Sequence, residues 1–170
     1  MVFEDEQSRG GAQADGGGLH GRFDFLLDAK KRCSIPSDWR DAMGAPACVY
    51  ILPDPVGPYL HLFPPDEMRR SFGALRNREL FDEDLDELLG IIGEHVDQVR
   101  LDVQGRIRVS DQMLAHAMIE DTVVLIGTQT RAQLWSLKMR PAVGAVNQVA
   151  FAEACRAYTR SRVRLLPPGR

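Results

Sequence analysis

A segment repeated at an interval of 74 residues constrains the fold of this chain more than any other feature. The stretch LDAKKRCSIP at 27–36 returns in altered form as LDVQGRIRVS at 101–110, with the Asp and the Arg of each copy four residues apart. At this offset, apolar positions keep their character from residue 25 to residue 52. Self-similarity at a fixed interval is the signature of a duplicated supersecondary unit. We therefore interpret the chain as two copies of one unit.

Each copy has the pattern of strand, turn, strand, short helix, strand and strand. The first two strands alternate apolar and polar residues, and the third is a short run rich in β-branched residues that suits a buried strand. The fourth follows a loop with proline or glycine, and we expect it at a sheet edge. The predicted strands are 23–27, 33–35, 47–52 and 59–63 in the first copy, and 99–103, 107–109, 122–127 and 132–136 in the second.

Helices are predicted inside and after each copy. Short helices at 37–43 and 110–119 follow residues whose side chains can accept the free amide hydrogens of a helix start, namely Ser37, Asp38, Ser110 and Asp111. Longer helical segments are expected at 64–77, 82–96 and 147–160. Leu85, Leu88, Leu89, Ile91 and Ile92 form an apolar stripe in the second of them, which indicates core packing more often than an interface.

Composition is that of a packed globular protein with segregated charge. The chain has 170 residues, 44% of them apolar, and a net charge of −3. Residues 79–87 hold six carboxylates and no base, whereas 156–170 hold five Arg and no acid. The acidic run suits the first turn of a helix, where the macrodipole favours carboxylates. Screening over about 8–10 Å isolates such patches, so an acidic protein can still present basic faces.

The termini and the thiols suggest a cytoplasmic protein. Residues 1–19 are polar and Gly-rich and are expected to form a disordered arm without the features of a signal peptide. No run of 18 apolar residues occurs, so no membrane span is predicted. Cys33, Cys48 and Cys155 are odd in number and form no CxxC pair, and we expect reduced, mostly buried thiols.

Residues around the first turn resemble the MraZ family. Its first repeat is matched by Gly21, Phe23, Leu27, Asp28, Lys30, Arg32, Ile35, Pro36, Trp39 and Arg40, and its second by Asp102, Arg106 and the run VVLIGTQTRAQLW. The resemblance covers about 20–140. It implies an α+β fold with two swapped-hairpin repeats of the SpoVT-AbrB type, forming an intrachain pseudo-dimeric small β-barrel with flanking helices. The expected boundaries are 20–93 and 94–160 for the two repeats with their helices, and 161–170 for a basic tail.

The same resemblance implies a function in transcription. It suggests a cytoplasmic, nucleoid-associated regulator, with repression the expected sign, of the division and cell-wall gene cluster. The protein would form a ring-shaped homo-oligomer on repeated promoter elements in double-stranded DNA. One departure is Lys31, which stands where the family usually has Gly; at positive φ it would be strained by about 1 kcal/mol.

The chemistry of the two turns fits DNA contact. Guanidinium groups bind phosphate or guanine in a bidentate way, and lysines add phosphate attraction. We expect the DNA contacts to be Lys30, Lys31, Arg32, Gln104 and Arg106, and we assign Asp28, Asp102 and Gly105 to turn structure. A solvated charged turn remains the plainer interpretation of either turn taken alone.

Two other function classes stay open, and one is disfavoured. An antitoxin-like regulator on the same hairpin fold would normally carry one hairpin per chain. A protein-interaction module could keep the fold without binding DNA. An enzyme is not expected, because the four His are scattered and no HExxH, G-x-S-x-G, P-loop or GxGxxG motif occurs. No metal site and no cofactor are predicted.

Overall fold

The structure is a computed structural model that describes residues 17–73, 83–141 and 148–164. The described residues fall into two compact units, one ending at Arg140 and the other beginning at Pro141. The second unit contains a single helix, α5 (Gln148–Arg164). The acidic stretch 79–82 and the end of the basic tail, 165–170, lie outside the described residues, as does the expected arm up to residue 16.

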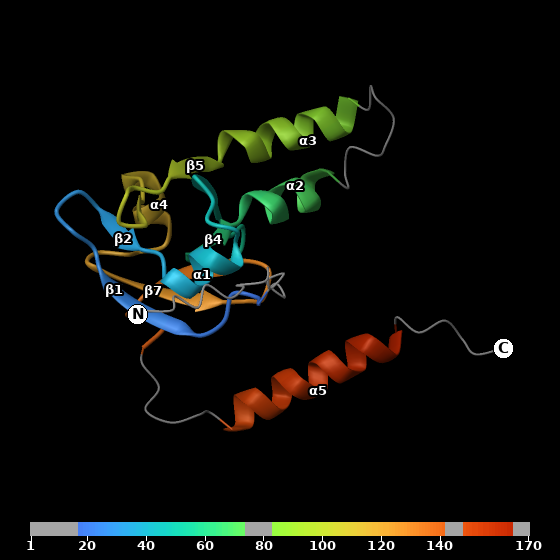
Figure 1. Cartoon of the computed structure of the whole chain (residues 1–170). Helices are drawn as coiled ribbons and strands as arrows, with labels where there is room; N and C mark the ends of the chain where they lie inside the picture. The colour runs from blue at the N-terminus through green and yellow to red at the C-terminus, as the bar shows by residue number, and fades with distance from the viewer. Residues whose placement is uncertain (1–16, 74–82, 142–147, 165–170) are drawn as a thin grey trace, which may run out of the picture. The chain divides into compact units, whose positions relative to one another are not determined.

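The first unit is built from two runs of the same element order. The first run is β1 (Arg22–Leu26), β2 (Arg32–Ser34), α1 (Ser37–Ala42), β3 (Cys48–Pro53) and β4 (Tyr59–Phe63), and it is followed by α2 (Pro65–Gly73) and α3 (Glu83–Glu94). The second run is β5 (Asp97–Arg100), β6 (Arg106–Arg108), α4 (Asp111–His116), β7 (Thr122–Gly127) and β8 (Ala132–Ser136). This arrangement confirms a mixed α+β fold (Figure 1).

Strands of the two runs pair with one another. The six-stranded sheet has the order β1-β7-β8-β4-β3-β5, and β2 pairs with β6 in a separate two-stranded ribbon. All these pairs are antiparallel. The expectation that 59–63 and 132–136 are edge strands is wrong, because β4 and β8 pair with each other at the centre of the sheet. The sheet does not close into the expected barrel, since β1 and β5, at the two ends of the strand order, do not pair with each other in the part of the chain that the structure describes.

An approximate two-fold symmetry relates the two runs. In the ribbon, Arg32 pairs with Arg108 and Ser34 pairs with Arg106. At the 74-residue offset Arg32 is equivalent to Arg106 and Ser34 to Arg108, so each pair is the symmetric counterpart of the other. The hydrogen bonds obey the same exchange. The amide of Ile35 donates to the carbonyl of Gly105, and the amide of Val109 donates to that of Lys31, at 2.9 and 3.0 Å. The duplication in the sequence thus becomes a symmetric pairing in space.

The core lies between the sheet, the ribbon and the two short helices. Trp39 of α1 and Met113 of α4 occupy equivalent buried positions. Leu19 is also buried and pairs with Gln129 through two backbone hydrogen bonds, so our assignment of this residue to a disordered arm is wrong. The caps of the two helices differ, since the hydroxyl of Ser110 accepts the amide hydrogen of Met113, whereas α1 has no side-chain cap.

The cysteines and the longer helices differ from expectation. Cys33 is buried in the core, but Cys48 is half-buried and Cys155 is exposed. No residue of α3 is buried, and Leu88 and Ile91 are 49% and 52% exposed. The apolar stripe of α3 therefore does not pack in the core of the described part of the chain, contrary to our expectation. Among the described helices, none combines the length and the apolar character needed to cross a membrane.

Candidate nucleic-acid interface

Each repeated turn is built around the carboxylate of its Asp. One oxygen of Asp28 accepts the backbone hydrogens of Lys30 and Arg32, both at 2.9 Å, and the turn closes with a backbone bond from Lys31 to Asp28. Seventy-four residues later, Asp102 makes the same bonds to the amides of Gln104 and Arg106, again at 2.9 Å. An Asp side chain that accepts successive amide hydrogens mimics a backbone turn. Local chemistry therefore fixes both turns in one shape.

The second oxygen of each carboxylate holds arginines. Arg32 Nε donates to Asp28 Oδ2 at 2.7 Å, and Arg106 Nε donates to Asp102 Oδ2 at 2.8 Å. The pairs also cross between the turns, with Arg32 Nη1 at 3.3 Å from Asp102 and Arg106 Nη1 at 3.7 Å from Asp28. We call these four side chains the Asp-Arg quartet. The quartet ties the two turns together, although they are 74 residues apart in sequence.

Hydrogen bonding keeps both carboxyl groups of the quartet ionised. The backbone amide of Arg32, followed by its guanidinium and the amide of Lys30, lowers the pKa of Asp28. The amide of Arg106, followed by its guanidinium and the amide of Gln104, lowers the pKa of Asp102 in the same way. Both lower values persist although partial burial opposes them. Two negative and two positive charges make the quartet neutral as a whole.

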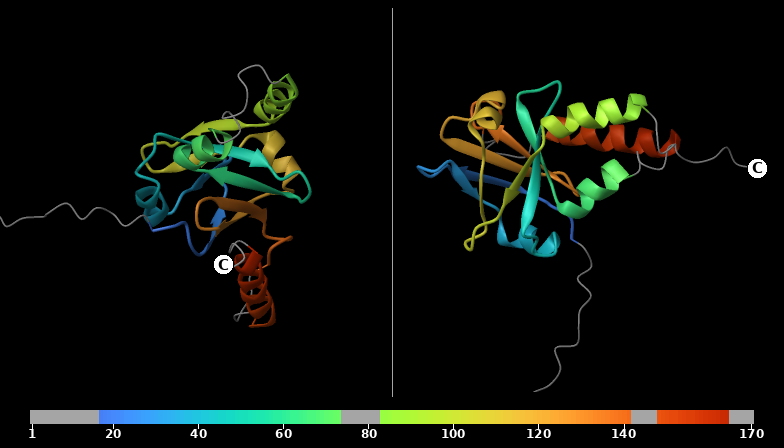
Figure 2. Two further views of the ribbon diagram at one scale, coloured as in Figure 1. Left: turned by 90° about the vertical axis from the view of Figure 1, so that its right-hand side faces the viewer. Right: turned by 90° about the horizontal axis from the view of Figure 1, so that it is seen from above.

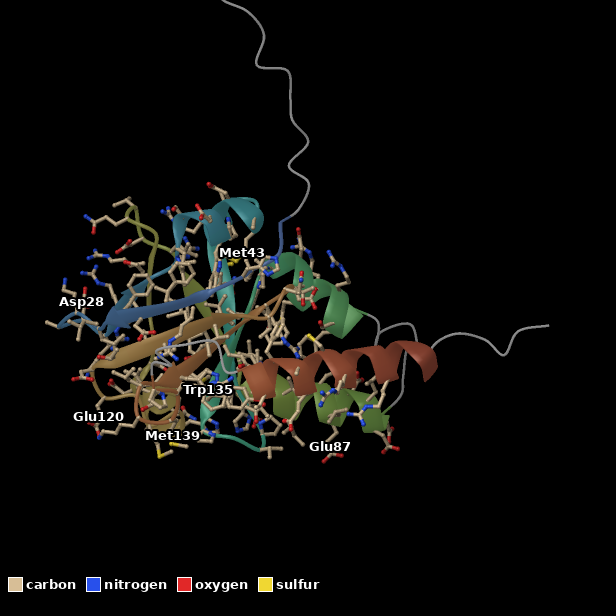
Figure 3. The ribbon with its side chains drawn as sticks, turned by 90° about the horizontal axis from the view of Figure 1, so that it is seen from below. Asp28, Met43, Glu87, Glu120, Trp135 and Met139 are labelled. Carbon is tan, nitrogen blue, oxygen red and sulfur yellow. The ribbon has the colours of Figure 1, made fainter. Side chains whose placement is uncertain are left out.

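The sequence-predicted contacts therefore divide into two groups. Arg32 and Arg106 are half-buried in the quartet, with 26% and 27% of their side chains exposed. They are not inside the core, but two guanidinium nitrogens of Arg32 and all three of Arg106 lie within 4 Å of a carboxylate oxygen. Lys30 and Gln104, in contrast, are exposed at the two tips, and Lys31 is half-buried. Both turns lie at one end of the first unit, where Figure 3 labels Asp28, and α2 lies at the other end of that unit (Figures 1 and 2).

Lys31 adopts the conformation that the family pattern reserves for Gly. Its φ is 60°, close to the 73° of Gly105 at the equivalent position. The replacement has therefore not changed the turn type, and the chain carries the strain of a left-handed lysine, about 1–2 kcal/mol. A lysine is tolerated in the first turn at this cost, and it adds a positive charge there.

Gly105 is required for a second reason, which involves Arg40 of α1. A Cβ atom on Gly105 would lie 2.6 Å from Arg40 Cζ and 2.6 Å from Arg40 Nε, closer than such atoms come. At the 74-residue offset the counterpart of Arg40 is Leu114 of α4, a buried apolar residue that offers the first turn no guanidinium. The Arg40 guanidinium thus packs on the second turn only, and this contact explains why the second turn keeps Gly.

One cation that sequence analysis missed lies on the ribbon. Cross-strand residues share a face, so Arg108 lies on the same side of the ribbon as Arg32 and Arg106, whereas Cys33 and Ile107 point into the core. Arg108 is exposed and has no ion-pair partner among the described residues. The alternation of Arg-Ile-Arg at 106–108 carries this signal in the sequence. The ribbon face therefore extends the basic surface beyond the tips.

A second polar cluster lies around Asp54, away from the turns. Its carboxylate accepts from the amides of Val56 and Gly57 and lies 2.8 Å from His61 Nε2. The cluster fixes the loop before β4 and resembles no nucleophile with its base. Among the residues that the structure describes, no group of three or more His, Cys, Asp or Glu side chains could hold a metal ion.

Comparisons with known proteins give a consistent set of relatives. A scan against models of known protein families finds no match. Curated proteins named "Transcriptional regulator MraZ" do match the chain. The one from Alkaliphilus metalliredigens is 29% identical over 68% of this chain and 79% of its own length. The one from Caldanaerobacter subterraneus is 26% identical over 79% and 92%, and the one from Chlorobium phaeobacteroides is 29% identical over 83% and 98%. Transcriptional regulators are not enzymes, which agrees with the absence of catalytic motifs.

Proposed function

Since the chain belongs to the MraZ family, we propose that it is a transcriptional regulator that binds double-stranded DNA through its two Asp-x-x-x-Arg turns. The observation that carries this proposal is the pair of turns with identical hydrogen bonding, joined by the Asp-Arg quartet and bearing exposed Lys30. A rigid pair of tips suits a duplex, whose phosphates and grooves repeat at regular intervals. Lysines next to phosphates release counterions and so favour binding.

The roles of the predicted contacts follow from their surroundings. Lys30 and Lys31 are proposed to contact phosphates, and Gln104 to contact base edges. Arg32 and Arg106 are proposed to fix the tips through the quartet and to offer the remaining guanidinium hydrogens to DNA. Asp28 and Asp102 shape the turns and are not expected to touch DNA, because carboxylates and phosphates repel each other.

We further propose the finer features that the family resemblance implies. The exchanged pairing of β1 with β7 and of β5 with β3 supports an intrachain pseudo-dimer of swapped-hairpin units. The exposed apolar residues of α3 support a ring-shaped homo-oligomer, in which many tips would act together on repeated promoter elements. In this proposal the protein acts at the nucleoid and represses the division and cell-wall gene cluster.

A binding assay with two charge-matched variants tests the DNA contact. The probe is a labelled duplex of the region upstream of the protein's own gene, measured by fluorescence anisotropy at stated salt. Lys30→Gln with Lys31→Gln should weaken binding at least tenfold. The control, Arg69→Gln with Arg70→Gln, removes two cations from α2 at the other end of the molecule and should bind as the wild type does. Equally weakened binding in both variants, or wild-type binding in the lysine variant, would argue against the turns.

A reporter gene under the same promoter tests regulation. Expression should fall when the wild-type protein is supplied and should recover with the lysine variant. A protein-interaction module would leave expression and DNA mobility unchanged, and an antitoxin-like regulator would be recognised by a toxin gene next to its own. Light scattering of the purified chain measures whether it forms the ring, since a ring requires a mass of several times 19.0 kDa.

A further inference from the structure

We propose that the two turns have different tasks on DNA, the first supplying salt-dependent phosphate binding and the second reading A·T base pairs in the major groove. This inference rests on the proposed function, because it assigns separate roles within one DNA-binding surface. It goes beyond the proposed function, in which both turns serve one DNA contact. The reason lies in three positions of each turn, residues 29–31 and 103–105.

The backbones of the two turns are the same, so only these side chains can differ in effect. Each Asp accepts the amide hydrogens two and four residues later at 2.9 Å, and each turn places its fourth residue at positive φ. Each arginine donates through Nε to the Asp of its own turn, at 2.7 and 2.8 Å, and each also lies within ion-pair distance of the other Asp. The side chains that the two tips present to DNA therefore differ mainly in Ala-Lys-Lys of the first turn and Val-Gln-Gly of the second.

The first turn presents positive charge and no side-chain amide. Lys30 is exposed, and neither it nor Lys31 has an ion-pair partner among the described residues. Ala29 beside them is exposed and has only a methyl group. Lysine binds phosphate as a point charge. It can also donate to O6 and N7 of guanine, but it has no acceptor and so cannot make the bidentate pair with adenine that an amide makes. The first turn therefore suits the DNA backbone of any sequence.

The second turn presents the opposite combination. Val103 is fully exposed, at 104% of its reference area, and Gln104 beside it is exposed too. An apolar side chain held at the very tip of a rigid turn has no packing role within the described chain. A glutamine amide pairs in a bidentate way with adenine N6 and N7, and an apolar side chain contacts the thymine methyl group. Both contacts lie in the major groove and favour A·T pairs.

The quartet makes this division useful, because it holds the two tips as one body. Arg32 Nη1 lies 3.3 Å from Asp102, and Arg106 Nη1 lies 3.7 Å from Asp28. When the first turn is anchored on phosphates, the second is presented to the groove without further ordering. Pre-organisation of this kind lowers the entropy cost of the sequence-reading contact.

Two variants that exchange the tips test the inference. Ala29→Val, Lys30→Gln and Lys31→Gly together copy the second tip into the first turn. Val103→Ala and Gln104→Lys copy the first tip into the second turn and leave Gly105 beneath Arg40 unchanged. All five changes lie at tips whose side chains are not buried, and each copies a turn that the chain already forms. The second variant should melt as the wild type does, and the first should melt at least as high, because Lys31→Gly removes the strain of a left-handed lysine.

The readouts are the slope of log K against log salt and the ratio of affinities for the protein's own upstream duplex and a shuffled duplex of equal composition. The first variant should have a slope shallower by about 0.9 for each phosphate that the tip no longer neutralises. Its affinity ratio should be no lower than that of the wild type, because the second turn is unchanged. In the second variant the ratio should fall by about fivefold to 150-fold, with a slope at least as steep as that of the wild type. The reverse assignment, or equal effects on both readouts, would overturn the inference.

Modified bases locate the contact in the groove. Uracil in place of thymine removes the methyl group, and 7-deazaadenine removes N7; each should weaken wild-type binding and leave the Val103→Ala, Gln104→Lys variant unaffected. Wild-type insensitivity to both bases would refute the base-reading role while leaving DNA binding itself intact. Failure of the wild-type protein to prefer its own upstream duplex would instead refute the proposed function, and the inference with it.

Discussion

The contact between Arg40 and Gly105 makes a quantitative prediction about stability. Gly105→Ala places a methyl group at a left-handed position, with φ of 73°. The backbone strain costs about 1–2 kcal/mol. Alanine also lowers the conformational entropy of the unfolded chain relative to glycine, which offsets about 0.4–1 kcal/mol of this cost. The new Cβ would also lie 2.6 Å from Arg40 Cζ, so the guanidinium must move. We expect the free energy of unfolding to fall by about 1–2 kcal/mol in total.

A double-mutant cycle separates strain from contact. In an Arg40→Ala background, Gly105→Ala should cost about 0.5–1 kcal/mol less, because only the backbone strain remains. Arg40 Nε is buried without a hydrogen-bond partner among the described residues, so the arginine can be removed without breaking a bond to Nε. Lys31→Ala is the matched control, since it alters the equivalent position and keeps a left-handed residue; it should change stability by less than about 0.5 kcal/mol.

Urea unfolding followed by circular dichroism gives the four free energies of the cycle. The variants should share one slope against urea, which would show that they unfold from equally compact states. A coupling energy below about 0.3 kcal/mol would refute the reasoning, because independent sites show no more than that. A destabilisation by Lys31→Ala as large as that by Gly105→Ala would refute it too, since the residue equivalent to Arg40 in the second repeat is Leu114 and not an arginine.

Two further predictions concern titratable groups. Burial raises the pKa of Asp54, but hydrogen bonds from Tyr59, Gly57, His61 and Val56 outweigh it and hold the pKa well below 3.8. Stability from Asp54 is therefore present above about pH 4 and lost as the pH falls further, so Asp54→Asn should flatten the acid side of a plot of melting temperature against pH. Burial raises the pKa of Cys33 to about 12. A thiol reagent at about pH 8 should therefore modify exposed Cys155 in the native protein and Cys33 only after unfolding, as peptide mapping would reveal.

The sequence by itself determined the features that depend on neighbours along the chain. The duplicated unit, its strands and short helices, and the shape of both turns follow from residue types within a few positions. Asp28, for example, satisfies amides two and four residues later, and the same bonds recur at Asp102. Backbone geometry allows only a few conformations for such short-range patterns, so similar residues at 27–36 and 101–110 form similar turns.

Only the tertiary structure decided which segments meet. Apolar alternation gives the same pattern for a central strand and an edge strand, so the central pairing of β4 with β8 could not be predicted. The pairing of Arg32 with Asp102 joins residues 70 positions apart, and the packing of Arg40 on Gly105 joins different repeats. Such contacts depend on the three-dimensional exchange of strands between repeats. In the structure, both arginines therefore belong to the Asp-Arg quartet, and Lys30, Val103 and Gln104 are the exposed residues at the tips.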